Sequence, residues 1–180
     1  MPLSDTPLVF DPHPAAYPVA TPTPGAPDPE TLGRAVRLYC RSAASLKLLD
    51  SILPGMGWQE GGCWILADAL ARAFGGEVWA MVSRPSPLQF LHRPGGLEEW
   101  RASTPSPGHM LLKYQGLFID SEGAGTAGTK LREYAEWTGI PDVILRPLKV
   151  STVRLIPRPI SGAKIAGAVR SRLRPLAWSI

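Results

Sequence analysis

The chain has 180 residues, 44% of them hydrophobic, and a formal net charge of +4. This is enough apolar material for one folded domain, so a chain that is disordered throughout is excluded. No apolar run approaches the ~18 residues that span a bilayer, and no lysine or arginine precedes Arg34 as it would in a signal peptide. Because Cys40 and Cys63 are too few for a disulfide framework, we expect a cytoplasmic protein in a reducing environment.

The positive charge is concentrated at the C-terminus. From Arg146 onward there are eight basic residues and no acidic one, whereas the rest of the chain has eleven basic and fifteen acidic residues, a balance of −4. This asymmetry favours an anionic partner for the tail, either nucleic acid or an anionic surface. The alternative is a terminal helix from Ser161 that packs Ile165, Val169 and Leu173 against its own domain and leaves its charges solvated.

Proline and charge divide the chain into three parts. Nine of the twenty prolines lie in the first thirty residues, where fixed φ angles and missing amide donors disfavour helices and central strands. We therefore predict an arm or linker over 1–30, a folded domain over 31–150, and a terminal strand with a basic tail over 151–180. Asp28 and Pro29 suit the cap and the first position of the helix that opens the domain.

Two helices are predicted in the first half of the domain. Apolar residues recur at steps of three and four from Leu32 to Leu53, which predicts one helix that ends at Pro54-Gly55. The segment from Cys63 to Phe74 is apolar on nearly every side, which is typical of a buried helix, and Gly75-Gly76 closes it.

Strands dominate the second half and predict an α+β fold with a mostly antiparallel sheet. Residues 84–108 are rich in proline and glycine and predict a loop with one helical turn at 97–100. The other predicted elements are a strand over 77–83, a hairpin of 109–113 with 117–120, a short polar helix over 129–137, and strands near 142–148 and 151–156.

Cys63 is the candidate nucleophile. It follows Gly61-Gly62 and opens the buried helix, and the free amides at a helix N-terminus favour the thiolate form of a cysteine. Gln59 lies four residues upstream, where its amide could join the Cys63 backbone amide in binding an oxyanion.

The predicted hairpin supplies a base and an orienting carboxylate. If Lys113 pairs with Gly116, His109 lies directly opposite Asp120; if the register shifts by two residues, Asp120 is a diagonal neighbour on the same face. In either register the carboxylate can hold the imidazole while the other ring nitrogen meets the thiol, which predicts a nucleophile–base–orienter triad.

Each of these residues also has an ordinary structural explanation. Free cysteines are often buried in cores, a histidine at a strand start is commonly structural, and Asp120 could simply begin a turn. The catalytic hypothesis depends on the three residues occurring together, in this order and on these elements.

A family resemblance adds to this interpretation. Gln59-Glu60-Gly61-Gly62-Cys63-Trp64 resembles the nucleophile segment of papain-like cysteine peptidases, although Gln59 lies closer to the cysteine than in papain. His109 and Asp120, with a glycine turn between them, resemble the transglutaminase-core and bacterial cell-wall-peptidase branches and small phage-encoded or toxin-associated members. The resemblance covers roughly residues 58–125 and implies a papain-like fold, with Cys63 as nucleophile, His109 as general base and Asp120 as orienter.

The function expected from these residues is a cysteine-nucleophile hydrolase or acyltransferase acting on a peptide or protein amide, as a peptidase, amidase or deamidase. This chemistry requires no cofactor. The histidines do not have the spacing of metal ligands, and the sequence has no CxxC or HExxH motif, so no metal site is predicted. The alternative is a non-enzymatic structural protein, virion-associated or bound to nucleic acid, that keeps a papain-like scaffold and binds through its basic tail.

Two further patterns are set aside. Residues 123–128 match the dinucleotide fingerprint GxGxxG, but the next helix is too polar for a Rossmann unit and no acidic residue follows Asp142 to hold a ribose. We predict a glycine-rich loop beside the active cleft instead. His92 is a rival base in a proline-glycine loop, without a spaced carboxylate partner.

Overall fold

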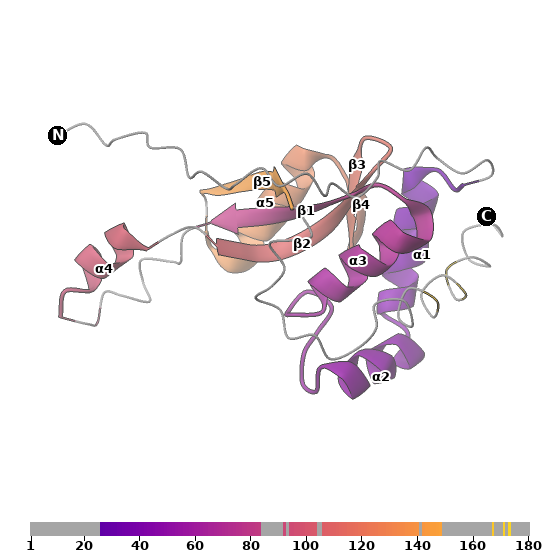
Figure 1. Ribbon diagram of the computed structural model, residues 1–180, viewed down its shortest axis with the longest axis horizontal. Coiled ribbons are helices and arrows are strands. Elements are labelled where there is room, and N and C mark those ends of the chain that lie inside the picture. The colour runs from indigo at the N-terminus through magenta and orange to yellow at the C-terminus, as the bar shows by residue number, and fades with distance from the viewer. Residues whose placement is uncertain are drawn as a thin grey trace.

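The computed structural model describes residues 26–83, 92, 94–103, 106–140, 142–148, 167, 171 and 173. Helices and a five-stranded sheet form an α+β domain, as predicted (Figure 1). The helices are α1 (Pro29–Cys40), α2 (Ala43–Ile52), α3 (Cys63–Phe74), α4 (Gly96–Ala102) and α5 (Ala127–Thr138). The strands are β1 (Glu77–Ser83), β2 (Ser106–Tyr114), β3 (Leu117–Asp120), β4 (Gly123–Gly125) and β5 (Val143–Pro147).

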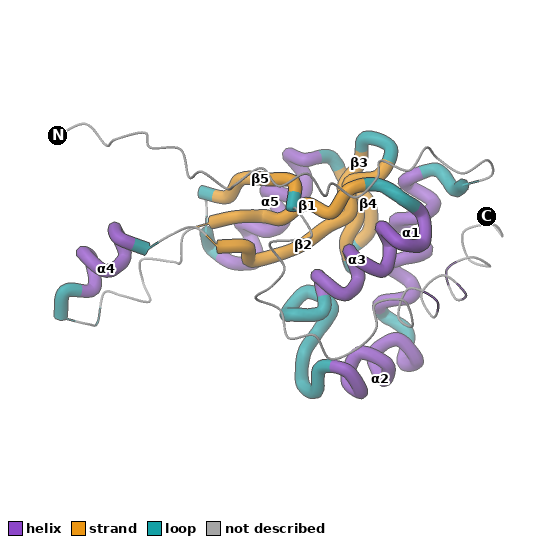
Figure 2. The backbone as a smooth tube through the Cα atoms, in the orientation of Figure 1, coloured by secondary structure: helices purple, strands orange, loops and turns teal. Residues whose placement is uncertain are grey.

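The sheet has the order β4-β3-β2-β1-β5, and every described pairing is antiparallel. Helices α1 and α3 pack on one face, α1 against β3 and β4 and α3 mainly against β2, while α5 packs against β3 and β5 on the other (Figure 2). Since neighbouring residues of a strand point to opposite faces, Leu112 joins the α1/α3 core and Leu111 joins the α5 side. The sheet therefore separates two buried layers.

The layer under α1 and α3 is the main hydrophobic core. Leu32 and Val36 of α1 and Leu70 of α3 are fully buried against Leu112 and Ile119. Leu173, in the predicted basic tail, is also fully buried in this core, which favours the interpretation that this part of the tail packs on its own domain.

The sequence predicted the starts of α1 and α3 and the bounds of α3 and β1. Asp28 caps α1 by accepting hydrogen bonds from the amides of Glu30 and Thr31, so the last residues assigned to the arm belong to the fold. The buried helix and the first strand have the predicted bounds, and nine of the twelve residues of α3 are buried.

The prediction of one helix from Leu32 to Leu53 is wrong. The first helix ends at Cys40 and a second, α2, begins at Ala43. The cause is Ser42, whose hydroxyl donates to the Tyr39 carbonyl at 2.8 Å and accepts from the Ser45 amide at 3.2 Å. A serine that bonds its neighbouring backbone in this way ends one helix and caps the next. The three- and four-residue spacing of apolar residues continues through Ser42, so the sequence pattern did not reveal the end of the first helix.

The hairpin adopts the second of the two predicted registers. Tyr114 pairs with Leu117 and Leu112 with Ile119, so the direct opposition of His109 and Asp120 is wrong and the two residues are diagonal neighbours. Gln115 and Gly116 form the two-residue loop with φ angles of 46° and 87°, as a type I′ turn requires. Turn geometry therefore sets the register.

The glycine-rich segment is a strand and not the predicted loop. Gly123–Gly125 forms β4 at the edge of the sheet, and Thr126 caps α5 directly after it. An antiparallel strand in this position also excludes the βαβ unit that a dinucleotide site needs.

Several other predictions differ or go untested. The helical turn at 97–100 is the longer α4, and β2 begins at Ser106 rather than at His109. The strand predicted over 151–156, the arm over 1–25 and most of the basic tail lie outside the described residues. Within the described part, no helix combines the length and the apolar character that crossing a membrane requires.

Candidate active site

The predicted nucleophile lies where α3 begins. Gly61 has a φ of 94°, a conformation that favours glycine, and a Cβ added to Gly62 would lie 2.8 Å from the Gly57 carbonyl oxygen. Both glycines are thus required for the tight turn into the helix. Gly62 is the N-cap and gives no side-chain hydrogen bond, so Cys63 stands at a helix N-terminus that no side chain caps.

The site is completed by the part of β2 that lies beyond its pairing with β3. The pairing of β2 with β3 covers only residues 112–114, which leaves the backbone at His109 and Met110 open on that side. The Met110 amide is directed at the Cys63 thiol and, with the Trp64 amide, stabilises its charged form. The Met110 amide thus connects the start of α3 with the strand that carries the histidine.

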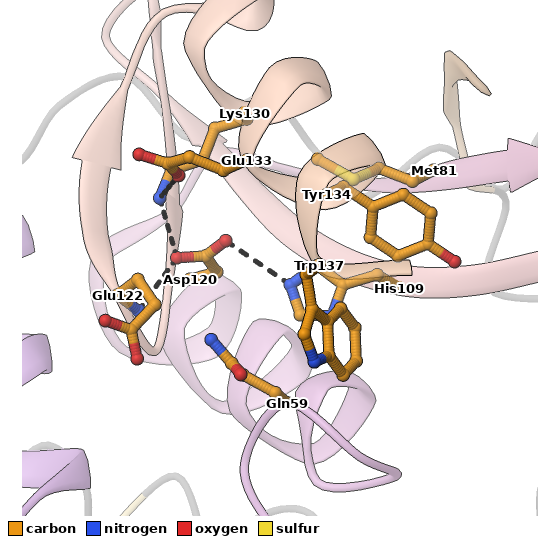
Figure 3. A pocket seen from close by; sticks show the side chains of 9 residues that line it. All are labelled: Gln59, Met81, His109, Asp120, Glu122, Lys130, Glu133, Tyr134 and Trp137. Atoms are coloured by element: carbon orange, nitrogen blue, oxygen red, sulfur yellow. Dashed lines mark hydrogen bonds and ion pairs between the residues drawn. The ribbon is translucent and has the colours of Figure 1, made fainter. Parts of the chain in front are cut away.

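His109 pairs with the predicted carboxylate and lies beside the predicted nucleophile. Its Nε2 lies 3.3 Å from Asp120 Oδ2 (Figure 3), and both side chains are buried, at 5% and 8% exposure. Nδ1 makes no hydrogen bond among the described residues, while the Cys63 thiol and the imidazole lie near enough for each to shift the pKa of the other. The structure thus brings Cys63, His109 and Asp120 together.

The ionisation of the pair follows from these contacts. Burial raises the pKa of Cys63, but the hydrogen bond from His109, its charge, and the Met110 and Trp64 amides outweigh it and lower the pKa below its usual value. Burial lowers the pKa of His109, but the hydrogen bonds and charges of Asp120 and Cys63 outweigh it and raise the pKa to about 9. Opposite shifts of this kind favour the thiolate–imidazolium form of the pair.

Lys130 is a site residue that the sequence analysis missed. It is 2% exposed, and its Nζ lies 2.8 Å from Asp120 Oδ1 and 3.1 Å from Glu133 Oε2. Burial raises the pKa of Asp120, but the hydrogen bond to His109 and the charge and hydrogen bond of Lys130 outweigh it and lower the pKa. The signal in the sequence was a lysine near the start of a helix, where the dipole disfavours a cation.

Two aromatic side chains of α5 cover the imidazole. The Tyr134 ring stacks on His109 with centroids 6.0 Å apart, and the Trp137 ring meets it edge-on at 6.3 Å. Gly108, the residue before His109, is required here because a Cβ would overlap the Tyr134 hydroxyl. Neither ring was predicted as part of the site.

A pocket opens beside the triad. Its lining includes the predicted oxyanion residue Gln59, together with His109, Asp120 and the half-exposed Trp137 (Figure 3). Cys63 is not part of this lining and is itself 7% exposed. The remaining lining residues are Met81, Glu122, Lys130, Glu133 and Tyr134.

The rival residues lie elsewhere. His92 is exposed in a turn. Cys40 is buried in the core, and burial, with the charges of Asp120 and Glu122, raises its pKa. Within the described part of the chain, no three His, Cys, Asp or Glu side chains are grouped to hold a metal ion.

Comparisons of the chain with protein-family models, with curated proteins and with solved structures find no match.

Proposed function

We propose that the protein is a papain-like cysteine hydrolase or acyltransferase that acts on amides. The observation that carries the proposal is the buried His109–Asp120 pair beside Cys63 at the start of α3, with the pKa of the thiol lowered and that of the imidazole raised. A buried cysteine without such a partner has a raised pKa, as Cys40 does. The pairing therefore supports a nucleophile rather than a core residue.

The reaction begins with the Cys63 thiolate. Its sulfur attacks the carbonyl carbon of the amide, and the carbonyl π electrons move to oxygen to give a tetrahedral oxyanion. The Cys63 backbone amide at the uncapped start of α3, joined by the Gln59 side chain, stabilises this charge. His109 then donates its proton to the amine nitrogen, the carbon–nitrogen bond breaks, and an acyl-thioester remains on Cys63.

The second half of the reaction releases the acyl group. Neutral His109 takes a proton from water, for hydrolysis, or from an amine, for transfer, and the resulting nucleophile attacks the thioester carbonyl. The carbon–sulfur bond breaks and the thiolate forms again beside the imidazolium. Throughout, Asp120 stays ionised and orients the ring through Nε2.

The proposal predicts a covalent acyl-enzyme at one residue. The protein is incubated with a small activated ester, p-nitrophenyl acetate, and the acetylated residue is located by mass spectrometry of peptides. We expect acetylation at Cys63, its loss in Cys63→Ala, and a large reduction in His109→Ala. Cys40→Ala is the matched control and keeps the modification.

Acetylation at Cys40 to the same extent as at Cys63, or a Cys63 acetylation rate that His109→Ala leaves unchanged, contradicts the proposal.

A further inference from the structure

We propose that Lys130 is a fourth, positioning member of the site, which fixes the Asp120 carboxylate for His109 and keeps the buried charges in balance. The proposal rests on the proposed function and deepens it, because it assigns the control of the site's ionisation to a residue that does not touch the thiol.

The two carboxylate oxygens of Asp120 have different partners. Asp120 Oδ1 accepts from Lys130 Nζ at 2.8 Å and from the Glu122 amide at 2.9 Å. Both donors occupy one oxygen, so Oδ2 is the oxygen presented to His109 Nε2 at 3.3 Å (Figure 3). Without the ammonium group, Oδ1 keeps a single backbone partner and the carboxylate is free to turn away from the ring.

The fold leaves a defined space for the Lys130 side chain. Its side chain is almost completely buried, and a Cβ added to Gly125 of β4 would lie 3.3 Å from its Cε. A buried ammonium group is costly unless it is paired and hydrogen-bonded, and Lys130 has carboxylate partners on two sides. The lysine is therefore held at a defined place and not in contact with Asp120 by chance.

The buried charges of the site also balance. Around the His109–Asp120 pair lie Lys130 and Glu133 of α5, Glu122 after β3, Cys63 of α3 and Cys40 of α1. Arg37 and Arg41 of α1 pair with Glu122, and Glu133 is half exposed. When Cys63 and His109 form an ion pair, the buried thiolate, imidazolium, carboxylate and ammonium sum to zero. Loss of Lys130 leaves this buried group with a net negative charge.

The test is the pH profile of Cys63 alkylation by iodoacetamide in the full chain. Lys130→Met keeps the aliphatic stem and removes the charge, so Asp120 takes up a proton at higher pH and stops holding the imidazolium. The acid limb of the profile is the range in which labelling rises with pH as the Cys63 thiol ionises. We expect this limb to shift to higher pH by about one unit, which slows labelling about tenfold at a given pH on the limb. Lys113→Met is the matched control: it removes the same charge from a lysine that lies over the Trp79 ring, and the limb stays in place.

Two more variants separate positioning from folding. In an Asp120→Asn background, Lys130→Met adds no further shift, because the lysine acts through the carboxylate. Glu133→Gln changes a half-exposed side chain, frees Lys130 for Asp120 and moves the acid limb slightly downward. This second variant gives the answer where Lys130→Met does not fold.

The outcomes distinguish this inference from the proposed function. If His109→Ala slows Cys63 labelling but Lys130→Met and Glu133→Gln both leave the acid limb unmoved, the positioning role is wrong and the triad stands. An equal shift from Lys130→Met with and without Asp120→Asn also overturns it. If labelling is indifferent to His109, the proposed function itself fails.

Discussion

The two faces of the sheet both contain fully buried side chains but differ in the kind of side chain that they bury. Under α1 and α3 the buried side chains are apolar, and Leu112 and Ile119 have no exposed surface. Under α5, His109, Asp120 and Lys130 are buried at 5%, 7% and 2% exposure among a few apolar neighbours. The first face gains stability from every group it hides, whereas each charge on the second persists only because a partner offsets its desolvation.

This difference indicates that the α5 face buries charged groups for a purpose other than stability. An apolar face with the same burial would stabilise the domain at least as well, since replacing buried ion pairs by apolar groups is often neutral or favourable. A face that keeps three buried ionisable groups beside an aromatic cover is instead suited to stabilise a nearby thiolate in its charged form. The comparison predicts that substitutions on the two faces have different kinds of effect.

The largest expected effect on stability is the loss of one buried partner. Lys130→Met leaves Asp120 short of its ammonium partner and lowers the free energy of unfolding by about 3–5 kcal/mol. Asp120→Asn combined with Lys130→Met removes both charges and recovers most of that loss. Urea denaturation of the two variants measures this, and additive losses in the double variant would contradict the pairing.

On the apolar face a substitution has no such rescue. Leu112→Ala removes buried methyl groups beneath α3 and lowers the free energy of unfolding by about 2–5 kcal/mol. The rate of Cys63 alkylation per folded molecule stays unchanged, because Cys63 is not part of the apolar cluster around Leu112, and His109 and Asp120 lie on the other face of the sheet. Leu38→Ala, at a residue that is 60% exposed, is the control and changes both quantities little. A loss of Cys63 reactivity in folded Leu112→Ala would show that the two faces are not independent.

The smallest of the three effects is the dependence of stability on acid. The pKa of Asp120 is lowered from 3.8 in the folded chain, so its contribution is fully present above that value and is lost as pH falls through the folded pKa. Below about pH 4 the wild-type protein therefore loses stability more steeply than the double variant that lacks both Asp120 and Lys130. Urea midpoints measured across this range test it, and parallel curves for the two proteins would count against a paired carboxylate.

How far the sequence predicts this structure depends on how local the determining contacts are. The bounds of α3 and β1 follow from an uninterrupted apolar pattern closed by Gly75 and Gly76. The hairpin was also predictable, together with the residues that it carries. Its register needed the turn type, since Gln115 had to adopt a positive φ angle.

The missed features depend on contacts between distant segments. A lysine in a polar helix is normally exposed, and the burial of Lys130 depends on Asp120 and on the room that Gly125 leaves. Tyr134 and Trp137 likewise become a cover for His109 only when α5 packs on the sheet. The break at Ser42 was missed because the helical phase of the apolar residues continues through it.

The most direct test of the central claim compares the two cysteines of the chain. Cys40 and Cys63 are buried to nearly the same extent, at 4% and 7% exposure, but the pKa of Cys40 is raised and that of Cys63 is lowered. Iodoacetamide labelling between about pH 6 and 7 should therefore modify Cys63 far faster, since only the thiolate reacts. His109→Ala should remove most of this advantage, and in denaturant both thiols should react alike. Equal native rates, or a fast Cys63 that is indifferent to His109, would contradict the account.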